Sequence, residues 1–232
     1  MHKIKEGALF IADAHYPHHG DELLHLLQHL ESGKIVTPQL FLMGDIFDLL
    51  FGYNDYIRHF SSEATALLQR LSQKMEIYYF EGNHDFLLKS IFKNINIYPR
   101  SMQPLFFDLN GQKIGLAHGD KFALGTLYDL YCFLLRNRWL IKVLKPLDRM
   151  IIDDRIARLK RKNICHPMKD FEKRAEEIVT LYPDVDLVIE GHYHQGKRIG
   201  SYLSLPSLSC QKQVAVAREG KIVFVEVDAL LL

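Results

Sequence analysis

The chain has 232 residues, of which 48% are hydrophobic, and this is enough to bury a sizeable core in one globular domain. Its 29 Lys and Arg residues nearly balance its 28 Asp and Glu residues, so the net charge is +1. This balance excludes a strong overall attraction to nucleic acid or to anionic membranes, and any such attraction must be local.

The three cysteines, Cys132, Cys165 and Cys210, lie far apart and form no C-x-x-C pair. We therefore expect neither a disulfide framework nor a thiolate zinc site, and the expected compartment is a reducing cytosol. We find no signal-peptide pattern at the N-terminus and no stretch that is apolar for long enough to span a bilayer.

Short apolar runs alternate with amphipathic stretches through the first half of the chain. The runs have the length of strands and lack a helical period; they are residues 8–12, 39–43, 76–80, 113–117 and 186–189. Residues 22–30 and 63–71 instead repeat apolar side chains every three or four positions, which predicts helices. The alternation predicts an α/β fold with a largely parallel central sheet.

The end of the chain has a different pattern. After Ile199, apolar runs at residues 202–205, 213–217 and 221–227 follow one another with no helix expected between them. They predict an antiparallel β-meander, which would make the sheet system mixed.

Residues 122–164 do not fit the alternation, because the segment is too long and too helix-favouring for a loop between strands. We expect an inserted helical element, called the lid below, within a single domain of residues 1–232. Pro146 is expected to divide the lid into two helices, since an interior proline removes a backbone donor and clashes with the preceding turn.

Each of the five early strands ends in residues that can bind metal ions. These ends are Asp13-Ala14-His15, Gly44-Asp45-Ile46-Phe47-Asp48, Gly82-Asn83-His84-Asp85, His118-Gly119-Asp120 and Gly191-His192-Tyr193-His194. Ligands bind at the carboxyl ends of the strands in open α/β sheets, so the five ends should converge. Carboxylates, imidazoles and an amide without thiolate suit Mn²⁺, Fe or Zn²⁺, and their number indicates two ions that share a bridging carboxylate.

In order and spacing, these motifs resemble those of the calcineurin-like metallophosphoesterase superfamily across most of the chain. The resemblance implies two mixed β-sheets sandwiched between helices, with the lid as an insertion. It also implies two divalent ions, expected to be Mn²⁺, the first bound by Asp13, His15 and His194, the second by Asn83, His118 and His192, and both by Asp45. Such ions lower the pKa of an attacking water and neutralise charge on a phosphoester.

The resemblance gives catalytic roles to two further residues. His84 would lie beside the metals and stabilise the transition state or protonate the leaving group, and Asp48 would fix the orientation of His84. His18 and His19 are interpreted as loop residues, with a place at the rim of the site as the alternative.

Within the superfamily, the chain looks most like the UDP-2,3-diacylglucosamine hydrolases of lipid A synthesis. The likeness rests on length, on the insertion after His118, and on the segments Asn137-Arg138-Trp139-Leu140, Pro146-Leu147 and Arg155-Ile156-Ala157-Arg158-Leu159-Lys160. It implies cleavage of the pyrophosphate of UDP-2,3-diacylglucosamine to UMP and 2,3-diacylglucosamine 1-phosphate. The expected substrate contacts are Asn83, His84, Tyr128 and Arg158.

The composition of the lid favours the same substrate. Residues 136–162 contain ten basic and three acidic side chains, interleaved with apolar ones. This mixture suits an acylated, anionic substrate taken from a membrane surface, so we expect a cytoplasmic protein bound peripherally to the inner membrane. A solvated helical face above a buried apolar side is the alternative. We expect no nucleic-acid partner, because the basic residues are confined to one segment.

Two other functions stay open at this point. The best-known branch of these hydrolases has arginine and glutamate where this chain has His84 and Asp48, so the chain is either a divergent branch or acts on another phosphoester. The first alternative is a soluble phosphodiesterase for small phosphoesters or cyclic nucleotides. The second is a nonenzymatic interaction module that keeps its metals for stability.

Overall fold

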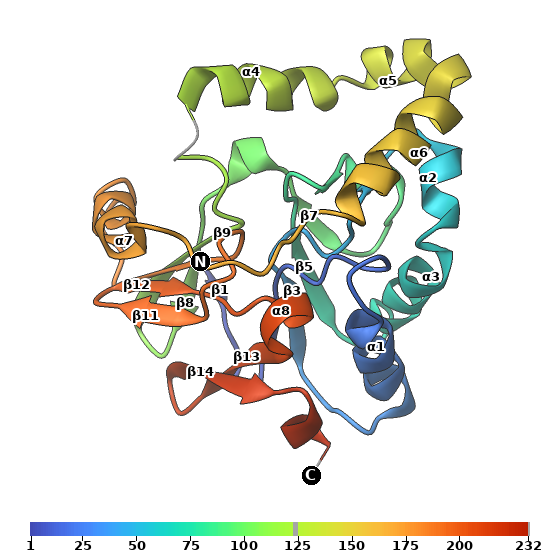
Figure 1. The fold of residues 1–232 in the computed structure, drawn as a ribbon. Helices are drawn as coiled ribbons and strands as arrows, with labels where there is room; N and C mark the ends of the chain where they lie inside the picture. The colour runs from blue at the N-terminus through green and yellow to red at the C-terminus, as the bar shows by residue number, and fades with distance from the viewer. Residues whose placement is uncertain (123–124, 232) are drawn as a thin grey trace.

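The computed structural model describes residues 1–122 and 125–231, and its core is two six-stranded sheets between helices (Figure 1). The first sheet contains, in spatial order, β14 (Lys221–Glu226), β13 (Gln213–Arg218), β2 (Leu9–Ile11), β3 (Gln39–Leu42), β5 (Glu76–Phe80) and β7 (Asn96–Tyr98). The second contains β1 (His2–Lys3), β8 (Leu105–Leu109), β9 (Gln112–Ala117), β10 (Leu187–Glu190), β12 (Tyr202–Ser204) and β11 (Lys197–Ile199). A separate strand pair joins β4 (Leu50–Phe51) to β6 (Asp85–Phe86). Both large sheets mix parallel and antiparallel pairs, which confirms the predicted fold class.

Helices cover the outer faces of the two sheets. The described helices are α1 (Glu22–Ser32), α2 (Asp55–His59), α3 (Ser62–Leu71), α4 (Gly125–Leu135), α5 (Arg138–Leu144), α6 (Asp148–Leu159), α7 (Phe171–Val179) and α8 (Leu208–Gln211). Four short 3₁₀ turns are Leu88–Ser90, Arg100–Met102, Lys145–Leu147 and Asp228–Leu230. The buried side chains of α1 and α3 share one apolar cluster with the first sheet, and those of α7 share another with the second sheet.

The alternation of side chains in β2 shows how the sequence builds these layers. Leu9 and Ile11 point toward the helices, whereas Phe10 points toward the second sheet, as the two-residue period of a strand requires. Between the sheets, Phe10 stacks on Phe41 with ring centroids 4.5 Å apart, and Phe41 meets Phe107 of the second sheet edge to face at 5.4 Å. This aromatic core fixes the sheets to each other and places the ends of β2, β3, β5, β9 and β10 near one another.

The predicted late meander is wrong in two respects. Strand β12 lies in the second sheet, parallel to β10 and antiparallel to β11, while β13 and β14 form a hairpin in the first sheet. A short helix, α8, also lies between β12 and β13. Ser207 begins this helix by accepting a hydrogen bond from the Cys210 amide, and its hydroxyl donates to the Asp13 carbonyl. These polar contacts direct the chain from the second sheet to the first, and they cannot be predicted from hydrophobic periodicity.

The lid contains α4, α5 and α6, which lie at the top and right of Figure 1, and residues 123–124 of the predicted lid fall outside the described residues. Pro146 lies in the 3₁₀ turn between α5 and α6, as predicted. A further break, between α4 and α5, was not predicted. It has a local cause, because the Asn137 side chain caps α5 by accepting from the amides of Trp139 and Leu140.

The lid is held to the core at α6 and also at α4, where the Arg100 guanidinium pairs with Asp129 at 2.6 Å. Ile152 and Ile156 of α6 pack against Ile57 of α2, and the Tyr56 hydroxyl donates to Asp153 at 2.8 Å. Nearer the metal motifs, the Arg136 guanidinium donates to the Gly82 carbonyl at 2.8 Å. These contacts fix α6 on the core.

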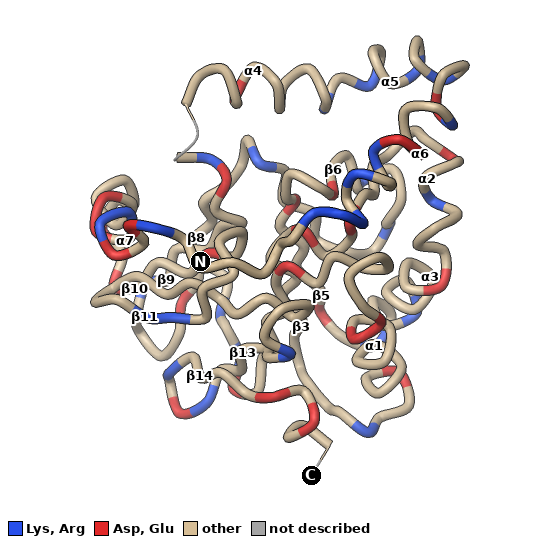
Figure 2. Tube along the Cα trace, in the orientation of Figure 1, with Lys and Arg blue, Asp and Glu red and all other residues tan. Residues whose placement is uncertain are grey.

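Large apolar side chains remain exposed on the lid. Those more than 60% exposed are Leu127, Phe133, Trp139, Val143 and Met150. Basic residues mark α5, α6 and the chain that leaves α6 (Figure 2). The alternative of a solvated face above a buried apolar side describes α6, whose Ile152, Ile156 and Leu159 are buried, but it does not describe α5, which has no buried residue. In the described parts of the chain, no helix has the length and apolarity needed to cross a membrane.

The expectation that the cysteines are unpaired is wrong for two of them. Cys165 and Cys210 form a disulfide, while Cys132 is free and buried in α4. The pairing depends on the fold, because the chain that returns from the lid passes beside α8, 45 positions away in sequence. Spacing along the chain carries no sign of such proximity.

Candidate functional site

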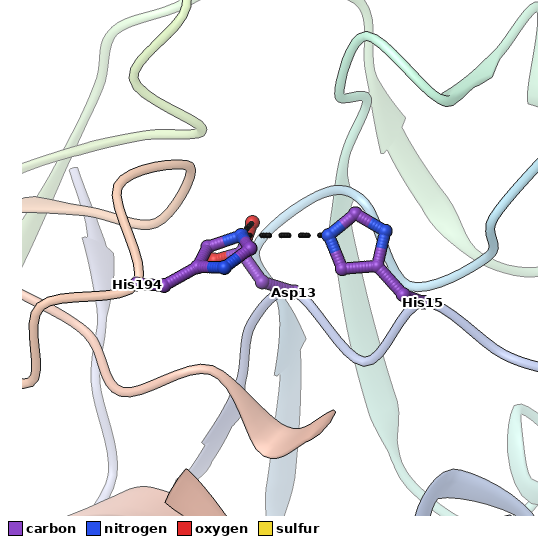
Figure 3. A group of neighbouring side chains, drawn as sticks. All are labelled: Asp13, His15 and His194. Carbon is purple, nitrogen blue, oxygen red and sulfur yellow. Dashed lines mark hydrogen bonds and ion pairs between the residues drawn. The ribbon is translucent and has the colours of Figure 1, made fainter. Parts of the chain in front are cut away.

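The first group of possible metal ligands contains Asp13 and His15, just after β2, and His194, after β10 (Figure 3). The Nε2 atoms of His15 and His194 are 3.4 Å apart, and His194 Nε2 is 3.3 Å from Asp13 Oδ1. One donor atom from each of the three residues lies within 4.8 Å of the others. Residues 179 positions apart therefore converge on one point, as predicted from the strand ends.

The second group contains Asp45, His118 and His192, whose donor atoms also lie within 4.8 Å of one another. Asp45 Oδ2 is 3.5 Å from His118 Nε2, and the amide oxygen of Asn83 is 3.3 Å from the same nitrogen. The two groups are joined, because Asp13 accepts a hydrogen bond from the His192 amide at 2.9 Å. All seven residues predicted as ligands thus lie together.

These groups lie at a cleft of about 490 Å³ between the strand ends and the chain that returns from the lid. The predicted ligands that line it are His15, Asp45, Asn83, His192 and His194. Asp13 and His118 lie behind them and are fully buried. An anionic group in the cleft could therefore reach both groups of donors.

The backbone at the site is left-handed at several residues, a conformation that is unfavourable for residues other than glycine. Five of the seven predicted ligands have a positive φ, between 47° and 64°; they are Asp13, His15, Asp45, His192 and His194. A left-handed backbone outside glycine costs of order 1–3 kcal/mol per residue, and such strain gathers at functional sites. The sequence does not reveal this feature.

Two glycines allow the strand ends to approach. A Cβ atom at Gly82 would lie 2.2 Å from Asp45 Oδ1, and one at Gly44, whose φ is 86°, would lie 2.3 Å from the His118 ring. Neither position could carry a side chain without moving a predicted ligand.

Main-chain carbonyls orient one histidine in each group of donors, His194 in the first and His118 in the second. Nδ1 of His118 lies 2.9 Å from the Met43 carbonyl, and Nδ1 of His194 lies 3.0 Å from the Ile164 carbonyl. Because a carbonyl only accepts, each Nδ1 donates its proton and each Nε2 is left to face the other donors. This is the usual outer support of metal-binding histidines.

Burial holds two of the four histidines neutral, as metal binding requires, while the nearby carboxylates favour protonation of His118 and His194. Burial lowers the pKa of both His15 and His192 well below the usual histidine value, so both imidazoles are neutral and can bind metal. Burial alone would raise the pKa of Asp45, but the charges of His118 and His84 outweigh it and hold this pKa well below its usual range. Burial alone would lower the pKa of His118, yet the Asp45 carboxylate raises it well above the usual value.

The donor set fits divalent metal ions. Two carboxylates, four imidazoles and one amide oxygen, with no thiolate among them, match the ligands of catalytic Zn²⁺, Mn²⁺ or Fe sites. The residues present would hold one ion at Asp13, His15 and His194 and a second at Asp45, His118, His192 and Asn83.

Asp85, to which the sequence analysis assigned no role, holds the ligand loops in place. Its fully buried carboxylate accepts hydrogen bonds from the amides of Asp45, Ile46, Phe47 and Gly82 and from the Tyr79 hydroxyl, at 2.6–3.3 Å. One side chain thus joins the loop of Asp45 to that of Asn83. The sequence signal for this role was the position of Asp85 directly after Asn83 and His84.

Asp85→Ala is expected to destabilise the fold by about 3–5 kcal/mol, because it leaves several buried donors without a partner. Asp108→Ala is the control, since its carboxylate makes no hydrogen bond among the described residues; a change within about 0.5 kcal/mol is expected there. Urea unfolding with and without Mn²⁺ measures both. Equal stability of the two variants would contradict the role of Asp85.

His84 lies beside the metal ligands, as predicted, with Nε2 4.0 Å from Asp45 Oδ2. Its Nδ1 donates to the main-chain carbonyl of Asp48 at 2.7 Å, so Asp48 orients His84 through its backbone. The Asp48 carboxylate instead accepts hydrogen bonds from the amide and ring of His18 and from the ring of His19. His18 and His19 therefore hold the Asp48 side chain in place, a role the sequence did not indicate.

The two predicted substrate contacts in the lid have different surroundings. The Tyr128 hydroxyl is 3.4 Å from Asp120, its ring lies beside Arg100, and Tyr128 does not line the metal cleft. Arg158 pairs with Asp154 at 2.9 Å and lines a second cavity, under the lid. Only Arg158 faces a space that a substrate could enter.

Comparison with known proteins identifies relatives of the whole domain. A family model described as calcineurin-like phosphoesterase matches residues 8–196. The UDP-2,3-diacylglucosamine hydrolase of Wigglesworthia glossinidia brevipalpis is 28% identical over 201 residues, which cover 82% of this chain and 80% of that protein. A protein of the same name from Vibrio cholerae is 26% identical over 195 residues, or 81% of each chain.

Among solved structures, a protein of unknown function from Aquifex aeolicus is 19% identical, with a TM-score of 0.46, and covers 97% of this chain and 100% of its own. A dimetal phosphatase from Danio rerio is 13% identical, with a TM-score of 0.45, and covers 94% and 95%. The family assignment rests instead on the match over residues 8–196, which agrees with the motif order and with the two groups of metal donors. The chain therefore belongs to the calcineurin-like phosphoesterase family, and the predicted dimetal phosphoester hydrolase is confirmed.

Proposed function

We propose that this protein hydrolyses the pyrophosphate of UDP-2,3-diacylglucosamine to UMP and 2,3-diacylglucosamine 1-phosphate. The observation that carries the proposal is an apolar cavity of about 260 Å³ under the lid, which shares Asn83 with the metal cleft. The curated relatives from two organisms have the name of this activity. An acylated nucleotide sugar is the substrate that would occupy both the metal cleft and the cavity under the lid.

The cavity has walls suited to acyl chains. The core contributes Leu49, Phe51 and Phe86, and the lid contributes Tyr131, Leu135, Leu140, Ile141, Leu144, Ile151 and Ile152. Arg155 and Arg158 also line it. Each methylene buried there contributes about 0.8 kcal/mol, while a guanidinium attracts the anionic part of the same substrate.

The exposed surface of the lid favours a membrane as the source of this substrate. Apolar side chains such as Trp139 and Val143 are 64% and 73% exposed, and basic residues alternate with them along α5. Surfaces of this composition bind anionic lipid interfaces. We therefore propose peripheral binding at the cytoplasmic face of the inner membrane. The expectation of no nucleic-acid partner stays a prediction.

In this reaction, bound divalent ions would supply an acidified water and positive charge at the phosphate, and we propose Mn²⁺ as the ion. Asn83 and His84 would contact the phosphate, and His84 would stabilise charge there or donate a proton, held in orientation by the Asp48 carbonyl. The place of Tyr128 beside Asp120 gives it no direct support as a substrate contact.

Release of UMP by the purified protein tests the proposal. The substrates are UDP-2,3-diacylglucosamine, UDP-N-acetylglucosamine and bis-p-nitrophenyl phosphate, each with added Mn²⁺. We expect strong preference for the acylated substrate, because only that substrate fills the lid cavity. Activity confined to acyl-free compounds would overturn the lipid assignment and favour a soluble phosphodiesterase, and no hydrolysis despite bound metal would favour the nonenzymatic module.

A further inference from the structure

The chain that returns from the lid, residues 160–166, is attached to the metal site at three points. The Lys162 carbonyl lies 3.4 Å from Nε2 of His19, and the Ile164 carbonyl accepts from Nδ1 of His194 at 3.0 Å. The third attachment is covalent, the disulfide from Cys165 to Cys210 of α8. All three lie on the side of the first metal group.

The disulfide lies against the outer side of a metal ligand. Cys210 Sγ is 3.8 Å from Nδ1 of His194, while Nε2 of the same ring faces Asp13 and His15. Cys165 directly follows Ile164, so the bond holds the Ile164 carbonyl in place against His194. Without the bond, the return chain would be held there by hydrogen bonds and by the buried side chain of Ile164, because its neighbours from Lys160 to Asn163 are exposed.

We propose that the Cys165–Cys210 disulfide is a positioning element for His194, and that its reduction selectively weakens the first metal site. In the exchange, one thiolate of an external dithiol attacks the sulfur of Cys165, an exposed residue, and releases Cys210 as a thiolate, which takes up a proton. The second thiol of the reagent then displaces Cys165 from the mixed disulfide. The protein gains two thiols and the reagent becomes a disulfide, so two electrons pass to the protein.

The second metal group provides an internal comparison. One of its two histidines, His118, is oriented by the carbonyl of Met43, just after β3. Met43 is fully buried and is bonded to neither cysteine of the disulfide. Loss of an outer partner of a metal-binding histidine lowers metal affinity about 10- to 100-fold. Reduction should therefore weaken one of the two sites about tenfold or more and leave the other unchanged.

The test is Mn²⁺ and Co²⁺ titration of the full-length protein, oxidised or reduced with dithiothreitol that is then removed under argon. Cys132→Ser is the matched control and should respond to reduction as the wild type does, because Cys132 is outside the bond. Cys165→Ser/Cys210→Ser should bind the ions as the reduced protein does, whatever the treatment. If the double variant does not fold, the comparison of oxidised and reduced wild type still provides the test, and circular dichroism checks that the reduced wild type is folded.

Each outcome decides for or against the proposal without reference to any lipid substrate. Weakening of the first site alone supports the proposal, and weakening of the second site alone overturns it. Equal binding by oxidised and reduced protein overturns it, as does weakening of both sites together, which would indicate a general loss of structure. Alkylation of three thiols in the unfolded protein, without prior reduction, would show that the bond does not form and would also overturn the proposal.

Discussion

Asp45→Ala is expected to lower phosphodiester hydrolysis by at least about 1,000-fold and to remove metal from the second group, because the ions supply most of the stabilisation of the transition state. Asp45 is almost fully buried and lies 3.5 Å from His118, and it also accepts a hydrogen bond from the His84 amide at 2.9 Å. The variant removes a proposed ligand and one of the contacts that join the two strand ends. The measurements are hydrolysis of bis-p-nitrophenyl phosphate and metal content by elemental analysis.

His84→Ala is the matched comparison for this prediction. The His84 side chain belongs to neither group of donors, so the variant should keep both ions. A lost general acid lowers the rate about 10²- to 10⁴-fold, and most for leaving groups that need a proton. The loss should therefore be larger with diphenyl phosphate than with bis-p-nitrophenyl phosphate. An equal loss with both esters would contradict the acid role and leave His84 as a stabiliser of charge.

Near-normal activity of Asp45→Ala would exclude the two-metal mechanism. Loss of activity with both ions still bound would show that Asp45 acts in another way. Urea unfolding of the metal-free proteins separates these results from unfolding, since Asp85 and its hydrogen bonds should keep the loops folded in the variant.

The sequence predicted which residues gather at the candidate metal site, because its signals are local. Each of these residues lies close after an apolar run, and parallel strands of one sheet end along a common edge, so the convergence of Asp13, Asp45 and Asn83 could be read from the chain. His118 instead follows β9 of the second sheet. The contacts that support these ligands are not local. Asp85 acts through five donors on three segments, and the Ile164 carbonyl reaches His194 across 30 positions.

The errors have the same origin. Strands β12 to β14 were recognised as strands, but their partners depend on contacts at Ser207 that periodicity does not report. The disulfide depends on the path of the chain after the lid, and Asp48 binds His84 through a carbonyl, which every residue possesses. Side-chain chemistry could be predicted from residue type, whereas the backbone contacts required the fold.

Leu144→Gln is expected to lower kcat/KM for UDP-2,3-diacylglucosamine about tenfold, because it places an amide without a hydrogen-bond partner in an apolar binding space. Leu144 is half-buried and lines the cavity under the lid. The rate with bis-p-nitrophenyl phosphate should not change, since this small ester needs only the metal cleft. The variant therefore separates the acyl-binding role of the lid from the chemistry.

Val143→Gln is the control, because Val143 lies on the same helix, is 73% exposed and does not line the cavity. With substrate in detergent micelles, where no membrane has to be bound, its kcat/KM should match that of the wild type. Equal losses in both variants would indicate that α5 contributes surface rather than a binding cavity. Unchanged activity in both would show that the acyl chains lie elsewhere. Only a loss confined to Leu144→Gln connects the cavity beside Asn83 to substrate choice.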